Sequence, residues 1–329
     1  MLLALWRRLI RSLSRQVTRR ISADGVPVTV EQRQQMARRL HPVIVAQRQR
    51  SYQAAVAQIR EAEPLLQPAP IREYPPEAVE AVLKRATEPP PRDIRSRARV
   101  TVAPAELDSR SRRQSRVRVT GPSPENRTDS VVVREVAEQV SVTLGRHVQQ
   151  AARDAVADTA EAAGDEIRWA RVLAGDENCA FCAMLASRGP VYRSEQTALG
   201  RGGARLDAYH DNCDCRAVLV REGEDWEGRE QQEWLETLWM TATDRMSNRP
   251  ARNMFRRAYR LDGQFQEALA AAREGRALPA QSRLDEATRT ALADIDGPDD
   301  TDGIREAHDA FLDQIKALNQ QVRRPNRTR

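Results

Sequence analysis

All four cysteines of this 329-residue chain lie within one window of 37 residues, from Cys179 to Cys215. The window opens with the pair Cys179-x2-Cys182 and closes, after 27 intervening residues, with His210-x2-Cys213-x-Cys215. Thiolates and an imidazole are the ligands that a tetrahedral Zn²⁺ ion prefers, and the Cys-x2-Cys spacing directs two sulfurs toward one centre. The window therefore predicts a structural zinc site that links two segments of the chain.

These five side chains are more than a four-coordinate ion needs, and two other interpretations stay open. Two of the cysteines can be a pair that is able to form a disulfide, or all four can pack as small buried hydrophobic side chains. A small β-hairpin with a 27-residue excursion buries too little surface to be stable alone, whereas a structural zinc contributes about 10 kcal/mol. We favour zinc because the pattern is typical of a closed, structural site.

The composition places the best-packed core around the same window. Only 4% of the residues are aromatic, against 30% that are charged. Large rings contribute the largest burial energies, so their position along the chain indicates where packing is densest. Ten of the fourteen aromatic residues fall between 169 and 265, namely Trp169, Phe181, Tyr192, Tyr209, Trp226, Trp234, Trp239, Phe255, Tyr259 and Phe265.

The N-terminal residues 1–62 are predicted to form a basic helical arm. Apolar residues follow a helical spacing from Leu2 to Val17. Positions 1–60 contain twelve arginines and only two acidic residues, so this segment carries a strong positive charge. A second helix is expected from Thr29 to Glu63, with Thr29 and Gln32 as a capping box. The arm can contact nucleic acid or an acidic partner, but we favour an amphipathic packing helix with a solvated basic face.

Residues 63–128 hold 11 of the 18 prolines and are predicted to be a Pro/Arg-rich linker. A short helix is expected over Pro76–Thr87 and a strand over Ala98–Val102. Residues 277–329 are poor in aromatic side chains and gain aspartates, which predicts a flexible tail with one short helix near Ile304–Val322.

Between the linker and the tail, residues 129–276 are predicted to form a core that carries the Cys/His window. A long helix is expected to run from 129 to near Gly175, because its apolar residues keep a helical spacing as far as Ile167. Ala180–Ser187 is expected to form a short helical turn and Asp214–Val220 a strand. An amphipathic helix is expected to follow over Trp226–Met246. The resulting fold class is mainly α with a small β element (α+β).

No stretch reaches the 18 or more apolar residues of a membrane span, and the apolar run at Met1–Trp6 is broken by Arg7 and Arg8. Four cysteines in a chain of this length also differ from the disulfide framework of a small secreted domain. We therefore expect a protein that is made in a reducing cytosol and has no membrane partner.

Four segments of the chain resemble parts of the minor head proteins of tailed bacteriophages, in particular the phage Mu F-like minor capsid proteins of actinobacterial phages. The segments are Arg168-Trp-Ala-Arg-Val172, Cys179-Ala-Phe-Cys182, Gly189-Pro-Val-Tyr192 and Tyr209-His210-Asp-Asn-Cys213-Asp-Cys215. The resemblance covers residues 129–260 best. It implies a virion component, assembled in the host cytoplasm, that joins the procapsid near the portal and contacts portal, coat and scaffold proteins. Packaged DNA is a further partner that the basic arm would fit.

Closely similar chains are also described as capsid maturation proteases, which cleave scaffold or coat protein. In that case Ser187 or Cys182 is the candidate nucleophile and His210 the candidate base. The chain has no G-x-S-x-G and no H-E-x-x-H motif, and a histidine that binds zinc cannot also act as a base. The residues therefore favour a non-enzymatic role, with the protease as the alternative.

Overall fold

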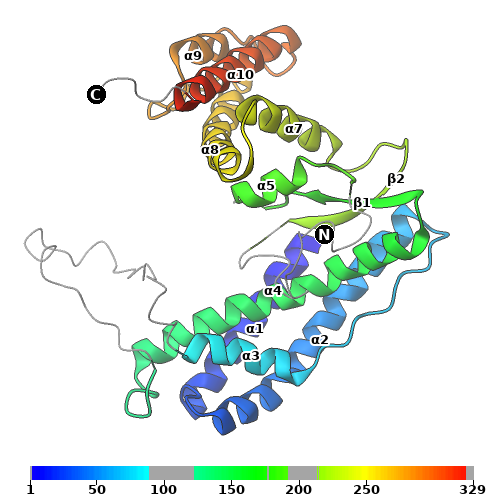
Figure 1. Cartoon of the computed structure of the whole chain (residues 1–329), viewed down its shortest axis with the longest axis vertical. Coiled ribbons are helices and arrows are strands. Elements are labelled where there is room, and N and C mark those ends of the chain that lie inside the picture. Colours follow the sequence, from blue (N-terminus) through cyan, green and yellow to red (C-terminus); the bar gives the residue numbers. More distant parts are fainter. Residues whose placement is uncertain (1, 89–121, 176–177, 192–212, 214, 324–329) are drawn as a thin grey trace, which may run out of the picture. The chain divides into compact units, whose positions relative to one another are not determined.

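The computed structural model describes residues 2–88, 122–175, 178–191, 213 and 215–323. They form two compact units, with the boundary between Ala155 and Val156. Most described residues are helical, and the described strands form one antiparallel sheet of two strands. The predicted fold class, mainly α with a small β element, is confirmed (Figure 1). Among the described helices, none combines the length and apolar character that crossing a membrane requires.

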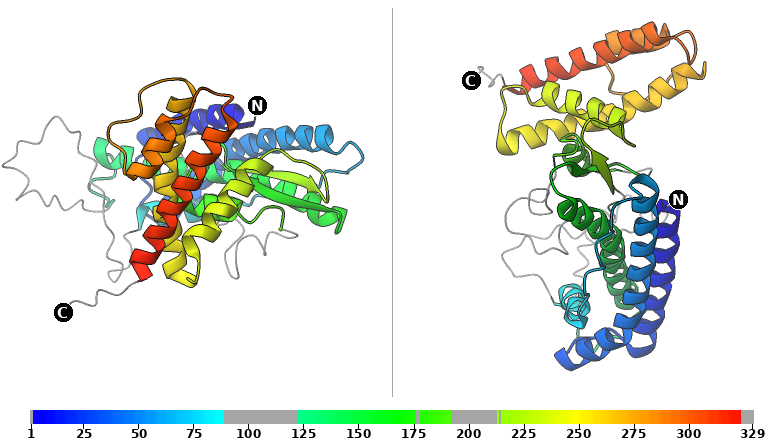
Figure 2. Two further views of the ribbon diagram at one scale, coloured as in Figure 1. Left: turned by 90° about the horizontal axis from the view of Figure 1, so that it is seen from above. Right: turned by 90° about the vertical axis from the view of Figure 1, so that its right-hand side faces the viewer.

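The described part of the first unit consists of α1 (Leu2–Asp24), α2 (Val30–Ala62), α3 (Pro76–Thr87) and most of α4 (Ser130–Ala163). Helices α1 and α2 lie side by side and antiparallel (Figure 2). The predicted bounds of α3 are confirmed, as is the capping box of α2. There the Thr29 hydroxyl accepts a hydrogen bond from the Gln32 backbone N–H at 3.2 Å, and the Gln32 side chain accepts one from the Thr29 N–H.

Aliphatic side chains at three- and four-residue spacing build the core of this unit. They include Leu9, Leu13, Val17 and Ile21 of α1, Leu40 and Ile44 of α2, Val79 and Leu83 of α3, and Val136, Val140, Leu144 and Val148 of α4. The arginines of α1, at positions 7, 8, 11, 15, 19 and 20, are all exposed. Helix α1 is thus an amphipathic packing helix, as favoured from the sequence.

Polar side chains in the same unit are buried together. The Tyr74 hydroxyl lies 2.8 Å from Nδ1 of His147, and the Arg48 guanidinium donates to the His147 carbonyl at 2.6 Å and lies over the Tyr74 ring. Burial raises the pKa of the Tyr74 phenol, which keeps the hydroxyl protonated. His147 is therefore a buried, hydrogen-bonded packing residue.

The long helix predicted from 129 to near Gly175 is shorter than expected. Helix α4 ends at Ala163, and Gly164 follows with φ of +88°, a left-handed conformation that commonly terminates helices. The next residues form β1 (Ile167–Val172), which pairs antiparallel with β2 (Arg216–Arg221). The prediction failed because Ile167 fits the helical spacing of α4, although it belongs to a strand rich in β-branched and aromatic residues.

The described part of the second unit carries this sheet and the helices α5 (Ala180–Ala186), α7 (Arg229–Thr243), α8 (Asn248–Arg273), α9 (Glu286–Ala293) and α10 (Thr301–Arg323). The short turn at 180–187, the strand after Asp214 and the helix within 226–246 were thus predicted near their observed positions. The core contains stacked rings among aliphatic side chains: Phe265 and Phe311 stack with ring centroids 4.4 Å apart, and Trp234 and Trp239 pack at its edge.

In the C-terminal region the helix predicted near Ile304–Val322 is confirmed as α10, but the predicted flexible tail is wrong, because α9 and α10 both pack onto the unit. Helix α10 has 23 residues and packs with α9 against α7 and α8. Its buried residues Ala307, Phe311 and Ile315 repeat every four positions and form an apolar stripe. The aspartates that suggested a flexible tail lie on the exposed side of α10 and in the loop before it. The overall composition of the region therefore gave no indication of the apolar stripe.

Two predictions fall outside the described residues, namely the strand over 98–102 and the position of His210. The four-region division at 62, 128 and 276 stays a prediction, although α3 lies within the region taken as a linker.

Candidate metal centre

Two separate segments of the second unit bring the cysteines together. Cys179 is the N-cap of α5, and Cys182 lies in the first turn of this helix. Cys213 and Cys215 immediately precede β2. Because β2 pairs with β1 along its whole length, the sheet fixes the point where the second pair enters the site. The Cys-x2-Cys pair is positioned in turn by the packing of α5 against α7, α8 and β1.

Three sulfurs converge on one centre. The Sγ atoms of Cys182, Cys213 and Cys215 all lie within 4.8 Å of one another. Cys182 and Cys213 are 3.3 Å apart, and Cys213 and Cys215 are 2.9 Å apart, measured between sulfurs. Each of the three residues is at most 3% exposed. The described residues thus bring together three of the five predicted ligands in a cluster that could hold a metal ion.

Cys179 lies beside this cluster. Its sulfur accepts a hydrogen bond from the backbone N–H of Cys182 at 3.3 Å, the usual role of an N-cap side chain. Cys179 is half-buried, unlike the other three cysteines. The Cys179 sulfur is not among the three that lie within 4.8 Å of one another, so its role as a ligand stays a prediction.

The distances bear on the choice between a metal and a disulfide. Two thiolates on one tetrahedral zinc lie about 3.8 Å apart, whereas a disulfide bond is about 2.0 Å long. The two observed separations, 3.3 and 2.9 Å, fall between these values, and all four cysteines are free thiols. A disulfide uses two sulfurs and leaves the third buried without a bond, whereas a metal ion uses all three.

The surroundings keep Cys182 protonated when no metal is bound. Hydrogen bonds with Cys179, then with Cys213 and Cys215, raise the pKa of the Cys182 thiol, and burial raises it further. Binding a metal must therefore displace protons from these thiols, which makes affinity depend on pH.

Arg171 is a member of the site that the sequence analysis missed. Its guanidinium Nη1 lies 3.7 Å from the sulfur of Cys215, and the side chain is 1% exposed. A positive charge at this distance favours the thiolate that a metal requires. No local signal in the sequence marks this residue, because both faces of β1 are largely buried and the contact with Cys215 depends on the pairing of β1 with β2.

Ser187, the candidate nucleophile of the protease alternative, is 5% exposed. Its hydroxyl donates to the backbone carbonyl of Met184 at 2.9 Å, within the last turn of α5. The Ser187 hydroxyl is thus buried and already engaged in a hydrogen bond. Its proposed base, His210, lies outside the described residues.

The fold and the site define a mainly helical protein with a buried thiol cluster beside a two-stranded sheet. The model of the VG15 protein family matches residues 4–242 of the chain, and the chain belongs to this family. The match includes every residue of the thiol cluster.

Two mycobacteriophage proteins are among the relatives. The Gene 15 protein of Mycobacterium phage D29 is 35% identical over 22% of this chain and 35% of its own length. The Gene 15 protein of Mycobacterium phage L5 is 30% identical over 23% of this chain and 36% of its own length. The chain thus spans about a third of the length of these relatives. No solved structure matches it.

Proposed function

We propose that this protein is a minor capsid protein of a tailed bacteriophage, of the phage Mu F-like kind, and that it acts in head assembly near the portal. The observation that carries the proposal is the C-x2-C … H-x2-C-x-C pattern, three of whose cysteines meet in one buried cluster. Membership of a family with mycobacteriophage relatives supports it. The protein would be a virion component whose partners are portal, coat and scaffold proteins.

The cluster would hold a structural zinc ion. Cys182, Cys213 and Cys215 would provide three ligands, and His210 or Cys179 the fourth. Buried sulfur-rich sites of this kind are closed and leave no position for a substrate. The ion would lower the free energy of the folded second unit by linking α5 to the start of β2, while Arg171 offsets part of the negative charge of the thiolates.

The exposed arginines of α1 suit an acidic protein surface or the packaged DNA. They are distributed around the helix opposite its buried stripe, so they can bind a partner without unpacking the core. Deleting α1 would remove Leu9, Leu13 and Val17 from the core of the first unit. Arginine-to-glutamine substitutions are therefore the appropriate way to test this surface.

The protease alternative gains no support from Ser187. A buried hydroxyl that donates to a helix carbonyl is neither exposed to substrate nor available to a base.

Co-expression with the coat, scaffold and portal proteins of the same phage tests the proposal. We expect the chain to co-purify with procapsids on a density gradient, and the coat and scaffold proteins to keep their full length. The Ser187→Ala variant should behave like the wild type. Procapsids that form normally without incorporating the chain would contradict a capsid role. Coat or scaffold fragments that vanish in a folded Ser187→Ala variant would establish the protease instead.

A further inference from the structure

Helix α8 carries a row of arginines that no acidic residue accompanies in the sequence. Between Asp244 and Asp262 the chain has six arginines and no aspartate or glutamate. Five of them belong to α8 and are exposed, namely Arg249, Arg252, Arg256, Arg257 and Arg260. The arginine row consists of Arg249, Arg252, Arg256 and Arg260, which follow one another after three, four and four positions. This spacing places them on one side of the helix, over a length of about 16 Å.

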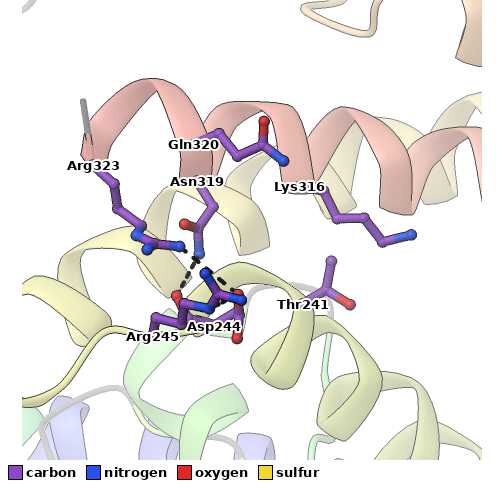
Figure 3. Close-up of a pocket in the computed structure, with 7 residues that line it drawn as sticks. All are labelled: Thr241, Asp244, Arg245, Lys316, Asn319, Gln320 and Arg323. Atoms are coloured by element: carbon purple, nitrogen blue, oxygen red, sulfur yellow. Dashed lines mark hydrogen bonds and ion pairs between the residues drawn. The ribbon is translucent and has the colours of Figure 1, made fainter.

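Other basic side chains of the second unit are paired with carboxylates. On α7, Nε of Arg229 lies 2.9 Å from a carboxylate oxygen of Glu233. Where α7 ends, Nε of Arg245 and Nη1 of Arg323 lie 3.7 and 3.8 Å from the same oxygen of Asp244 (Figure 3). The positive charge is thus compensated locally at these positions.

The five arginines of α8 have no such compensation. None of them forms an ion pair with a residue that the structure describes. Asp262 also lies on α8, but it is 5% exposed, and its Oδ1 accepts hydrogen bonds from Trp234 at 2.9 Å and Gln266 at 3.1 Å. Its carboxylate is therefore already engaged, and the arginine row keeps its full positive charge.

The arginine row lowers the stability of its own helix. Arg256 lies one turn from Arg252 and from Arg260, and like charges at this spacing destabilise a helix. Arg249 lies in the first turn, which contains no acidic residue and where the helix dipole disfavours a cation. Glutamine has a helix propensity close to that of arginine and would avoid both effects. Side chains that oppose local stability in this way are typical of a functional surface.

The composition of this face of α8 indicates the kind of partner. The exposed residues beside the row are Asn253, Arg257 and Gly263, so the face has no apolar centre. Protein–protein interfaces usually have an apolar centre from which charged side chains are depleted. Surfaces for single-stranded nucleic acid combine cations with aromatic rings that stack on bases, and the exposed residues of α8 include no aromatic ring. Double-stranded DNA requires neither feature, because its phosphates carry about one negative charge per 1.7 Å of helix axis.

We propose that the arginine row of α8 binds the phosphate backbone of double-stranded DNA. The guanidinium groups donate hydrogen bonds to phosphate oxygens and release counterions from the DNA, without reading the base sequence. The inference gives the second unit a DNA-binding surface, which goes beyond a role in head assembly. It is independent of the thiol cluster, so it can fail while the proposed function holds.

Binding of a fluorescein-labelled 30-base-pair duplex to the full-length protein, followed by fluorescence anisotropy over a range of salt concentrations, tests the proposal. The row variant combines Arg252→Gln, Arg256→Gln and Arg260→Gln. The charge-matched control changes three exposed arginines of the second unit outside α8, and it combines Arg276→Gln, Arg289→Gln and Arg305→Gln.

The row variant should bind the duplex about ten-fold or more weakly than the wild type at about 0.1 M salt. Each phosphate contact contributes about 0.9 to the steepness of log K against log salt concentration, so the steepness should fall by about 2.7. The control should change it by less than about 0.5. The row variant should also melt at the wild-type temperature or above it, because the substitutions remove repulsion between neighbouring arginines.

Two other probes identify the ligand class. A 30-nucleotide oligo-dT should bind more weakly than the duplex, and hexaglutamate binding should respond equally to the row variant and the control. The proposal is overturned if the wild type fails to bind the duplex at low salt, or if both variants lower the salt dependence equally. It is also overturned if oligo-dT binds as tightly as the duplex, or if the row variant selectively weakens hexaglutamate binding. A row variant that melts below the wild type would show that the row stabilises α8, which equally contradicts the proposal.

Discussion

The two units of this protein are stabilised by different kinds of core. The first unit is built from long helices, and its core consists of aliphatic side chains in register with the helical repeat. The second unit combines a core in which aliphatic side chains surround the stacked rings of Phe265 and Phe311 with a cluster of three thiols. The thiols connect α5, which has seven residues, with the start of β2, which has six, and β2 pairs with the equally short β1.

This difference follows from how much surface each element can bury. A helix such as α4, with 34 residues, presents many apolar side chains to its neighbours. A seven-residue helix and a two-stranded sheet bury much less, and an isolated two-stranded sheet is marginally stable at best. We infer that cross-linking replaces burial where the elements are short. The following predictions test this contrast.

The largest effect is expected from the thiol cluster. A structural zinc contributes about 10 kcal/mol, so Cys182→Ser or a chelator should unfold the region around α5 and β2. The first unit should keep its fold, because its core contains no cysteine. Hydrogen exchange measured by mass spectrometry on peptides from each unit will distinguish the two responses.

The open alternatives for the cysteines predict other outcomes of the same measurement. If a disulfide stabilises the site, reductant and not chelator should accelerate exchange. If the cysteines are only packing residues, neither reductant nor chelator should change the rate of hydrogen exchange. Accelerated exchange in both units to the same extent would contradict the contrast itself.

The stacked rings in the core of the second unit should give the next largest effect on stability. Phe311 is fully buried and stacks on Phe265, so Phe311→Ala should lower the free energy of unfolding of the second unit by about 3–5 kcal/mol. Phe181 is 49% exposed and is the matched control, for which Phe181→Ala should cost less than about 1 kcal/mol. Denaturant melts monitored by tryptophan fluorescence will measure both. Equal losses would show that α10 does not complete this core.

The polar interior of the first unit should contribute less. Tyr74→Phe removes the hydroxyl that bonds Nδ1 of His147 inside the core, which should cost about 1–3 kcal/mol. In the control Tyr52→Phe, the lost bond to the Ala69 carbonyl is only partly buried, and about 0.5–1.5 kcal/mol is expected. A smaller loss for Tyr74→Phe than for Tyr52→Phe, measured by denaturant melts, would show that the buried network is not stabilising.

The smallest effect is expected at the capping box of α2. Thr29→Ala removes the acceptor for the Gln32 N–H and should destabilise the first unit by about 1 kcal/mol. Thr18→Ala, at an exposed position within α1, should be neutral or slightly stabilising because alanine has the higher helix propensity. Thermal melts by circular dichroism will compare the two, and equal melting temperatures would exclude a role for the cap.

The parts of this structure that were predicted from the sequence are those with a local physical signal. The stripe of α1, the cap of α2 and the bounds of α3 depend on spacing and capping within one helix, and they were found correctly. The end of α4 was not, because Ile167 satisfies the helical repeat by chance while its strand partner Arg221 lies 54 positions away. Pairing between distant segments leaves no local signal.

The candidate site shows the same limit. Cysteine and histidine spacing predicted five candidate ligands, and the described residues bring three of them together, namely Cys182, Cys213 and Cys215. It did not predict Arg171, whose contact with Cys215 depends on the register of β1 against β2. Nor did composition predict the packing of α10. The many aspartates of this region indicated disorder, although three apolar residues of α10 form a buried stripe.

The zinc content of freshly purified, reduced, full-length protein tests the central claim most directly. Elemental analysis by mass spectrometry should find close to one zinc ion per chain in the wild type. The Cys182→Ser variant should contain markedly less, and the Ser187→Ala variant as much as the wild type. Wild-type protein that is folded, reduced and free of metal would contradict the claim that a metal ion cross-links the second unit.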